Sequence, residues 1–191
     1  MLLLDLLLAR PAAYRHADQS PRAALWMAGF LLAVGALYGV LVARFQLALG
    51  GSLQGFPVAE ISGAVLYGGN VVAGVLVALV FHGGVTLVLW LMTRAVGGPG
   101  RLGLLYRASA YLLPLAVPAL PFLAADSAAR AGGAAVLPLA AWYPYLAGGS
   151  VAWLSLGLVQ VVRTTQGTGL ARSLTAVVLF TLFCGSILLV L

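Results

Sequence analysis

Long apolar runs alternate with short polar segments along the whole chain. The polar segments hold arginines together with glycine, proline, serine or glutamine, while the runs between them contain almost no charged side chains. A bilayer core of about 30 Å is crossed by a helix of about 20 apolar residues. The pattern therefore predicts an all-α, polytopic membrane helical bundle with five transmembrane helices, at residues 24–43, 70–93, 104–125, 143–162 and 174–191.

Residues 1–22 are expected to form a separate N-terminal segment before the five-span membrane domain of residues 23–191. The apolar stretch that opens this segment is too short to span and is closed by Arg10 and Pro11. It is therefore predicted to be a short interfacial helix. Ser20 and Pro21 are typical of a helix start, because serine caps free N–H groups and proline is tolerated at the first helical position.

Three prolines distinguish the third run. Pro114, Pro118 and Pro121 are spaced four and three residues apart, so they lie near one face of a helix. Each proline lacks an N–H group and leaves a carbonyl one turn earlier without its partner. This spacing predicts a proline-kinked third helix whose free carbonyls need a neighbour. The glycines and proline at 97–100 predict a sharp turn before it.

The apolar run from 134 to 162 is longer than one bilayer crossing requires. Pro144 and the aromatic residues Trp142, Tyr143 and Tyr145 favour a fourth span that begins near Tyr143. The pattern leaves open whether residues 134–142 are embedded or interfacial.

Small residues recur four positions apart in the first two spans, at Gly35 and Gly39 and at Gly74 and Ala78. Such pairs allow two helices to approach closely. Ordinary packing within one chain is the favoured explanation, and dimerisation through these pairs is the alternative.

Composition supports the membrane class. The chain is 63% hydrophobic and only 7% charged, which leaves too few polar side chains to cover a globular surface. All ten basic residues are arginines, and they are scattered singly rather than forming a basic stripe, so nucleic acid is not an expected partner.

The arginines also predict an orientation. Eight fall on one side of the five-span pattern: Arg10, Arg15, Arg22, Arg94, Arg101, Arg107, Arg163 and Arg172. Only Arg44 and Arg130 fall on the other. Because arginine is enriched in cytoplasmic loops, the N-terminus is expected in the cytoplasm and the C-terminus outside, in the cytoplasmic (inner) membrane. The basic loops that carry Arg94, Arg101, Arg107, Arg163 and Arg172 are expected to meet anionic lipid headgroups.

A candidate intramembrane polar site consists of His82, Asn70, Pro114 and Pro118. An ionisable side chain near the middle of a span is a functional candidate by default. One interpretation is a structural histidine whose neutral imidazole is satisfied by one carbonyl or hydroxyl, and the kinked third helix offers carbonyls; a role in handling protons or a ligand is the alternative. Asn70 is explained by hydrogen bonding between helices. No metal site is expected, because no second histidine or acid lies in an adjacent turn.

Standard catalytic signatures are absent from the sequence. It contains no HExxH, CxxC or GxSxG motif, and the lack of lysine rules out a Walker A loop. The chain is therefore not expected to be an enzyme or to bind a cofactor.

Three segments carry a resemblance to a known family. They are LLLARPAAYR at 6–15, GGPGRLGLLYRASAYLLP at 97–114 and GLARS at 169–173. In their order and spacing they resemble bacterial Yip1-domain (YIP1 family) integral membrane proteins. The resemblance implies five spans with a cytoplasmic N-terminus. Eukaryotic members of the family are associated with Rab GTPases and with traffic between endoplasmic reticulum and Golgi, whereas bacterial relatives have no settled activity.

Two functions from different classes follow. The first is a non-enzymatic membrane scaffold or adaptor, with basic inner loops that face lipids and either a membrane-protein partner or a second copy of the chain. The second is a small transporter, channel or lipid-moving protein that uses the kinked third helix and His82 to line a path.

Overall fold

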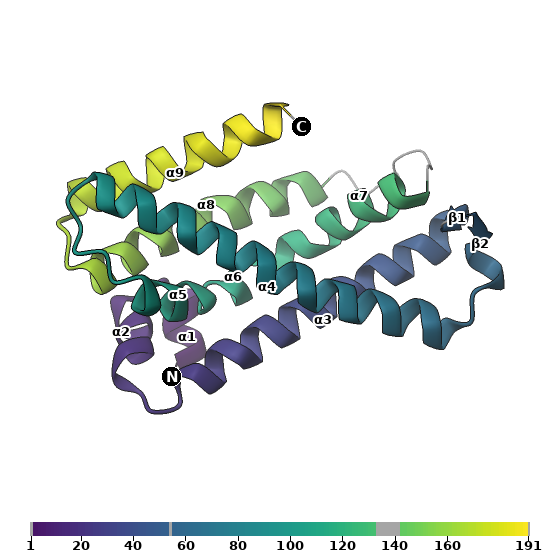
Figure 1. Ribbon diagram of the computed structural model, residues 1–191, viewed down its shortest axis with the longest axis horizontal. Coiled ribbons are helices and arrows are strands. Elements are labelled where there is room, and N and C mark those ends of the chain that lie inside the picture. Colours follow the sequence, from purple (N-terminus) through teal and green to yellow (C-terminus); the bar gives the residue numbers. More distant parts are fainter. Residues whose placement is uncertain (1, 54, 133–141, 191) are drawn as a thin grey trace. The chain divides into compact units, whose positions relative to one another are not determined.

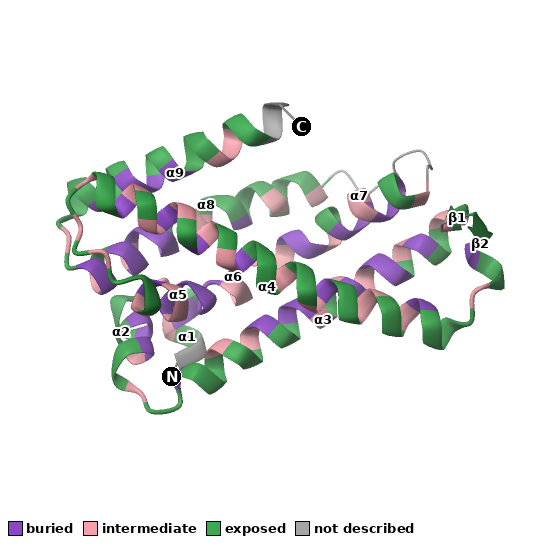
Figure 2. Ribbon diagram, in the orientation of Figure 1, coloured by how far each residue is buried: buried purple, intermediate pink, exposed green. Residues whose placement is uncertain are grey.

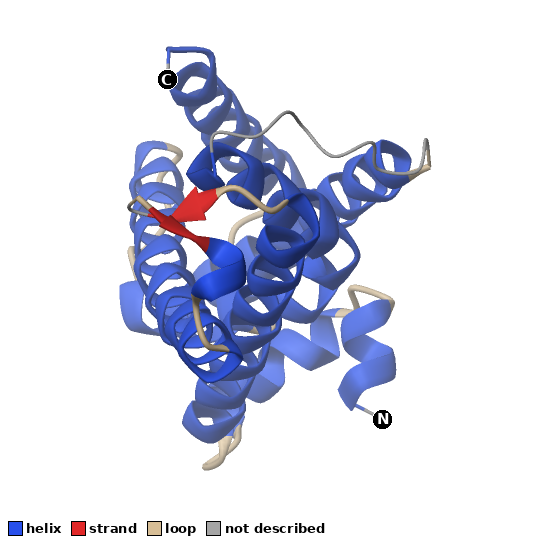
Figure 3. Cartoon of the chain, turned by 90° about the vertical axis from the view of Figure 1, so that its right-hand side faces the viewer, coloured by secondary structure: helices blue, strands red, loops and turns tan. Residues whose placement is uncertain are grey.

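In the part of the chain that the structure describes, the fold is all-α apart from one small hairpin (Figure 1, Figure 3). The computed structural model describes residues 2–53, 55–132 and 142–190. Its helices are α1 Leu2–Leu7, α2 Pro11–Gln19, α3 Ala23–Leu49, α4 Gly63–Ala95, α5 Leu102–Ala110, α6 Leu113–Ala116, α7 Leu120–Gly132, α8 Tyr143–Gln166 and α9 Leu170–Val190. Two 3-10 turns, η1 Val58–Glu60 and η2 Val117–Ala119, and the strands β1 Ser52–Leu53 and β2 Phe56–Pro57 complete the described elements.

Four of the described helices, α3, α4, α8 and α9, are long and apolar enough to cross a membrane. Helix α5 is followed, after a short break and a bend of 46°, by the helical segment Leu113–Gly132. If these two pieces together form one span, the number of candidate spans rises to five. Large apolar residues, among them Val80 and Phe81 of α4, are exposed on these helices. Figure 2 shows that most of α9 is likewise exposed. Such a surface fits a lipid environment. The predicted count of five spans stays a prediction.

Helix α3 runs six residues past the predicted end of the first span at 43. Arg44 does not end the helix, because the residues up to Leu49 are compatible with it. The end of the span itself at 43 stays a prediction. The chain turns only at Gly50 and Gly51, where φ is 66° and 87°. These positive values are easily reached by glycine and disfavoured for other residues.

Helix α4 begins seven residues before the predicted start at 70. Ser62 precedes its first residue, and the Ser62 hydroxyl accepts a hydrogen bond from the N–H of Val65 at 3.4 Å. A serine at this position caps a helix start. The connection between α3 and α4 is therefore shorter than predicted and contains the antiparallel β1–β2 hairpin, in which Ser52 pairs with Pro57 and Leu53 with Phe56.

The predicted third span, 104–125, is several helices in the structure. Helix α5 ends at Ala110, and α6 starts at Leu113 with Pro114 in its first turn. Proline cannot donate a hydrogen bond to the carbonyl four residues earlier, so a regular helix cannot pass this point unchanged. A kink within one continuous helix stays a prediction. The chain stays helical beyond the predicted end of this span at 125, because α7 continues to Gly132, with a 2.9 Å ion pair between Arg130 and Asp126.

Helix α8 begins at Tyr143, the residue at which the fourth span was predicted to start. The loop predicted at 163–173 was too long, because α8 continues to Gln166 and α9 already begins at Leu170. The chain turns at Gly167, where φ is 62°. The open question about residues 134–142 falls outside the described residues except for Trp142, whose ring stacks on Tyr143 at 4.2 Å.

The chain divides into two compact units. Unit 1 comprises residues 1–30, 80–115 and 152–191, and unit 2 comprises residues 31–79 and 116–151. Tyr14 of α2, Leu105 of α5 and Val161 of α8 are fully buried in the apolar core of unit 1. The N-terminal helices thus belong to unit 1, and α2 packs against α5 (Figure 1). Whether these helices lie at a membrane surface stays a prediction.

Glycines bring α3 and α4 into close contact in unit 2. A Cβ atom added to Gly39 would overlap the backbone of Asn70, and one added to Gly74 would overlap the carbonyl oxygen of Gly35. A Cβ atom on Gly35 would lie 2.7 Å from the Cα atom of Val75. The prediction that the small-residue pairs pack within one chain is confirmed.

A second contact in unit 2 joins α3 to α7. The hydroxyls of Tyr38 and Ser127 lie 2.6 Å apart. Beside them Val42 packs with Ala124 and Ala128, which are almost completely buried. Small residues on α7 therefore allow the aromatic and branched side chains of α3 to approach it.

Gly39→Leu is expected to destabilise the protein by about 1–3 kcal/mol, because the added side chain would force α3 away from α4. The measurement is the thermal midpoint of the full-length protein in a mild detergent. Gly69→Leu is the matched control, since nothing lies within 4 Å of a Cβ at Gly69. Leucine also favours helix more than glycine, so this control should be neutral or slightly stabilising. Equal midpoints for the two variants would contradict the α3–α4 contact.

Candidate functional site

His82 lies on α4 and is buried against α5 in unit 1. The side chain is 3% exposed, and its Nε2 atom lies 3.0 Å from the carbonyl oxygen of Tyr106. The imidazole also contacts the ring of Tyr106, with 4.6 Å between the centroids. The structure therefore gives His82 a carbonyl partner in the predicted third span.

Two hydroxyls extend this contact into a short polar seam. We use this name for His82 and Thr86 of α4 together with Tyr106 and Ser109 of α5. The hydroxyls of Thr86 and Ser109 lie 3.0 Å apart, and the Ser109 hydroxyl donates to the Tyr106 carbonyl at 3.2 Å. A carbonyl oxygen has two lone pairs and can accept from both Ser109 and His82. The polar seam thus satisfies its own buried groups.

Asn70 takes part in a different contact, in unit 2. Its Nδ2 atom donates to the side-chain oxygen of Gln46 at 3.0 Å and to the carbonyl of Leu66 at 2.8 Å. Gln46 is 5% exposed. Gln46 was not predicted as a partner because it lies beyond the predicted end of the first span at 43. A glutamine among helix-forming residues just beyond that limit was the available signal.

The structure does not bring the four predicted site residues together. His82 and Asn70 lie in different units and have different partners. Pro114 is in α6, and Pro118 is in η2. Neither proline takes part in the hydrogen bonds of His82 or Asn70. The prolines instead mark the part of the chain where regular helix is interrupted.

Gln166, at the end of α8, binds the loop between α4 and α5. Its Oε1 atom accepts from the backbone N–H groups of Gly100 and Arg101, both at 3.1 Å, and its Nε2 atom donates to the Arg101 carbonyl at 3.2 Å. The indole of Trp90 donates to the Gly100 carbonyl at 2.9 Å. Gln166 was not predicted as a functional residue because it lies between the predicted fourth and fifth spans, at 163–173. It is 3% exposed.

The loop arginines differ in their surroundings. The guanidinium carbon of Arg94 lies 5.9 Å from the centre of the Trp90 ring, a cation–π distance. Arg101 is held through its backbone, and its side chain is exposed. Arg107 is half-buried on α5, whereas Arg163 and Arg172 are exposed at the ends of α8 and α9 that meet at the 167–169 loop.

Tyr14 of α2 is a buried polar residue that sequence reasoning did not single out. It is fully buried, and its hydroxyl has no hydrogen-bond partner in the described chain. A Cβ atom on Gly157 would come within 3.2 Å of that hydroxyl, so the glycine makes room for it on α8. Burial raises the pKa of the Tyr14 hydroxyl above its ordinary range, which keeps the group neutral.

The residues of the polar seam can form hydrogen bonds, and the arginines of unit 1 carry positive charge. In the polar seam, hydrogen bonds join the His82 imidazole and the hydroxyls of Thr86 and Ser109 through the Tyr106 carbonyl. Within the described ranges, no three histidine, cysteine, aspartate or glutamate side chains are placed to hold a metal ion. The exposed arginines of unit 1 can attract anionic groups.

Comparison with known proteins gives no match to a family model, a curated protein or a solved structure. The resemblance to Yip1-domain proteins stays a prediction.

Gln166→Ala is expected to release the loop at 96–101, because three hydrogen bonds to its backbone are lost. The amide hydrogens of Gly100 and Arg101 should exchange faster with deuterium, and the protein should lose about 1–3 kcal/mol of stability. Gln160→Ala is the control, since the Gln160 side chain accepts only a 3.4 Å bond from Arg163 at the helix surface. Equal exchange at the two amides in both variants would contradict the role of Gln166.

Proposed function

We propose that this chain is an integral membrane scaffold or adaptor of the Yip1 type, without enzymatic activity. It crosses the cytoplasmic membrane five times, with the N-terminus in the cytoplasm and the C-terminus outside. Its cytoplasmic end binds anionic lipid headgroups and a membrane-protein partner or a second copy of the chain.

One observation carries this proposal: three separate arginine-bearing parts of the sequence come together in unit 1. The loop at 96–101 is bound by Gln166 of α8, and α2 packs against α5. Unit 1 thereby holds eight of the ten arginines and two acids, Asp5 and Asp18, so the whole formal net charge of +6 belongs to it. Arg44 and Arg130 belong to unit 2 with two acids, Glu60 and Asp126.

The concentration of arginines in unit 1 supports the proposed orientation, with the N-terminus in the cytoplasm. Three chain segments on the same side of a membrane are expected to meet one another, and arginines are enriched on the cytoplasmic side. Each arginine near an anionic surface contributes about 1 kcal/mol of attraction. A unit that carries most of the arginines is therefore suited to hold the protein against anionic lipids or acidic segments of a partner.

The small-residue pairs are not the expected partner surface. Gly35, Gly39 and Gly74 already pack against backbone within the chain. A partner helix would instead contact the apolar side chains that α4 leaves exposed, such as Val72, Leu76 and Val80.

Replacing Arg94, Arg101 and Arg107 by glutamine is expected to lower recovery of a partner when the tagged full-length chain is purified in mild detergent. Loss of about 1 kcal/mol per arginine corresponds to about fivefold for each charge. Arg44→Gln combined with Arg130→Gln is the control in unit 2. Undiminished recovery with the first set of variants would contradict the basic scaffold.

His82→Ala separates the scaffold from a transporter. In proteoliposomes, a proton-flux assay and a fluorescent-lipid scrambling assay are expected to give the same result for this variant as for the wild type. The variant should be less stable, because a buried hydrogen bond is lost. Thr175→Ala is the control, since Thr175 is exposed and bonds only within α9. A flux that folded His82→Ala loses and Thr175→Ala keeps would overturn the scaffold proposal.

A further inference from the structure

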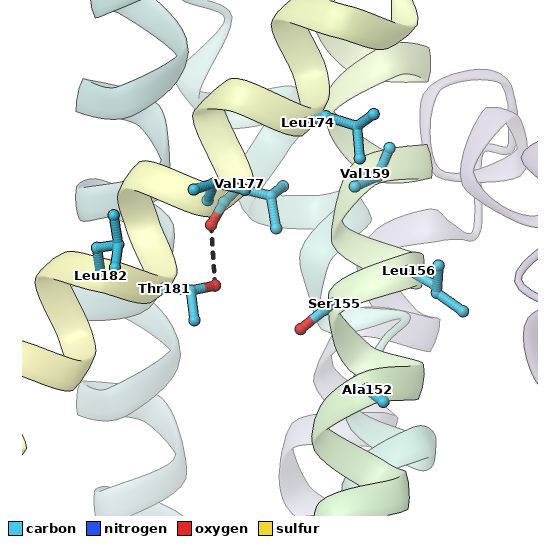
Figure 4. A pocket seen from close by; sticks show the side chains of 9 residues that line it. Ala152, Ser155, Leu156, Val159, Leu174, Val177, Thr181 and Leu182 are labelled. Atoms are coloured by element: carbon cyan, nitrogen blue, oxygen red, sulfur yellow. Dashed lines mark hydrogen bonds between the residues drawn. The ribbon is translucent and has the colours of Figure 1, made fainter.

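An apolar groove runs between α8 and α9 within unit 1 (Figure 4). It has a volume of about 450 Å³. The lining residues are Ala152, Ser155, Leu156 and Val159 from α8 and Leu174, Val177, Val178, Thr181 and Leu182 from α9. Their spacing of three and four residues places each set on one face of its helix. The two faces therefore look into a common groove.

The floor and the rims of the groove differ in exposure. Val159 and Val177 are buried, whereas Leu156, Val178 and Leu182 are more than half exposed. The hydroxyl of Thr181 donates to the carbonyl of Val177 at 2.9 Å, a bond within its own helix (Figure 4). An apolar lining of this kind favours an apolar occupant.

An exposed arginine continues the α8 face of the groove. Arg163 lies seven residues after Leu156 and four after Val159, so it follows them on the same face, one turn nearer the 167–169 loop. Its Nη1 atom donates to Gln160 at 3.4 Å. Among the described residues, ion pairs join Arg10 to Asp5 and Arg130 to Asp126, and Arg163 has no carboxylate partner. A guanidinium has five N–H donors in a fork that suits a phosphate.

We propose that the α8–α9 groove binds an acyl chain of an anionic phospholipid whose phosphate is bound by Arg163. This proposal rests on the proposed function, because it requires unit 1 to face the anionic leaflet. The occupant has a hydrocarbon tail for the groove and a negative group for the guanidinium. Going from the 167–169 loop into the bilayer, Arg163 comes first and the groove follows. The phosphate and the hydrocarbon tail of a lipid have the same order.

The length of the groove favours a lipid chain over a transmembrane helix. From Leu174 to Leu182 the groove follows α9 for about 12 Å, at 1.5 Å per residue. One leaflet contributes about half of a 30 Å hydrocarbon core. A lipid of the leaflet nearest the loop would therefore fill the groove, whereas a partner helix would need a surface twice as long. The volume lies in the range usual for small-ligand sites.

Arg172 is not part of this site. It lies two residues before Leu174, away from the face that lines the groove. Its Nη1 atom would lie 3.9 Å from a Cβ atom on Gly97, so the side chain leans toward the loop at 96–101. Of the two arginines that flank the α8–α9 turn, Arg163 therefore belongs to the site and Arg172 does not.

The test is native mass spectrometry of the full-length protein released from nanodiscs that contain equal amounts of dioleoylphosphatidylglycerol and dioleoylphosphatidylcholine. The wild type is expected to retain the anionic lipid in preference to the zwitterionic one. Arg163→Gln should lower this preference about fivefold, the effect of one basic residue at an anionic surface. Arg44→Gln, an exposed arginine of unit 2, should leave it unchanged.

A second pair of variants tests the groove itself. Val178→Trp fills it and should reduce retention of both lipids, whereas Leu179→Trp, the next residue on α9, lies outside the groove and should not. Both positions tolerate a larger side chain because they are exposed. Equal retention in the two tryptophan variants would overturn the proposal. So would a dimer that Val178→Trp converts to monomer with unchanged lipid, because the groove would then hold a second copy.

The outcomes also separate this site from the proposed function. If the anionic preference persists in Arg163→Gln and in Val178→Trp but falls when Arg94, Arg101 and Arg107 are replaced, the groove proposal is wrong and the basic scaffold stands. If the wild type shows no preference for the anionic lipid, both are contradicted.

Discussion

Polar groups among apolar helices must find their partners within the chain, and the contacts of α4 follow from this requirement. A buried polar group without a hydrogen bond costs several kcal/mol in an apolar environment. In unit 1 the imidazole of His82 uses a backbone carbonyl of α5, and in unit 2 the amide of Asn70 uses the side chain of Gln46 on α3. The second bond forms where Gly39 and Gly74 allow the α3 and α4 backbones to touch. Helix α4 is thereby fixed to a different neighbour in each unit.

Contacts between neutral groups also explain how eight arginines can be held in one unit. Like charges repel, so the arginines themselves cannot assemble unit 1. Neutral contacts do so instead: Gln166 binds the backbone of Gly100 and Arg101, and α2 buries Tyr14 in the apolar core. Seven of the eight side chains stay exposed, and Arg107 is half-buried. Water, salt or anionic headgroups can therefore screen their repulsion.

Periodic apolar runs and glycine spacing predicted much of the fold, whereas helix ends and side-chain partners were harder. The all-α class, the start of α8 at Tyr143 and the packing of Gly35 and Gly39 within the chain were predictable, because each depends on local pattern. Helix ends were placed at arginines, yet α3 and α8 continue until a glycine with positive φ turns the chain. Long arginine side chains can reach water from within a helix, so they mark its end poorly.

Residues whose roles depend on tertiary contacts could not be identified from the sequence. Gln46 and Gln166 read as surface residues, and only the neighbouring helix or loop gives each a buried role. Carbonyls of the third span were expected as available hydrogen-bond partners of His82, but Tyr106 was not identified as the residue that provides one. The candidate site was predicted as one group of four residues, whereas His82 and Asn70 have separate contacts.

The central claim is that the arginine-bearing segments of unit 1 lie on one side of the membrane. Single cysteines at Ala12, Ala59 and Gly169, in a chain whose Cys184 is replaced by serine, test it with a membrane-impermeant maleimide on intact cells. The cysteine at position 59 should react at once, and those at 12 and 169 only after permeabilisation. If positions 12 and 59 behave alike, or if 12 and 169 differ, the claim is contradicted.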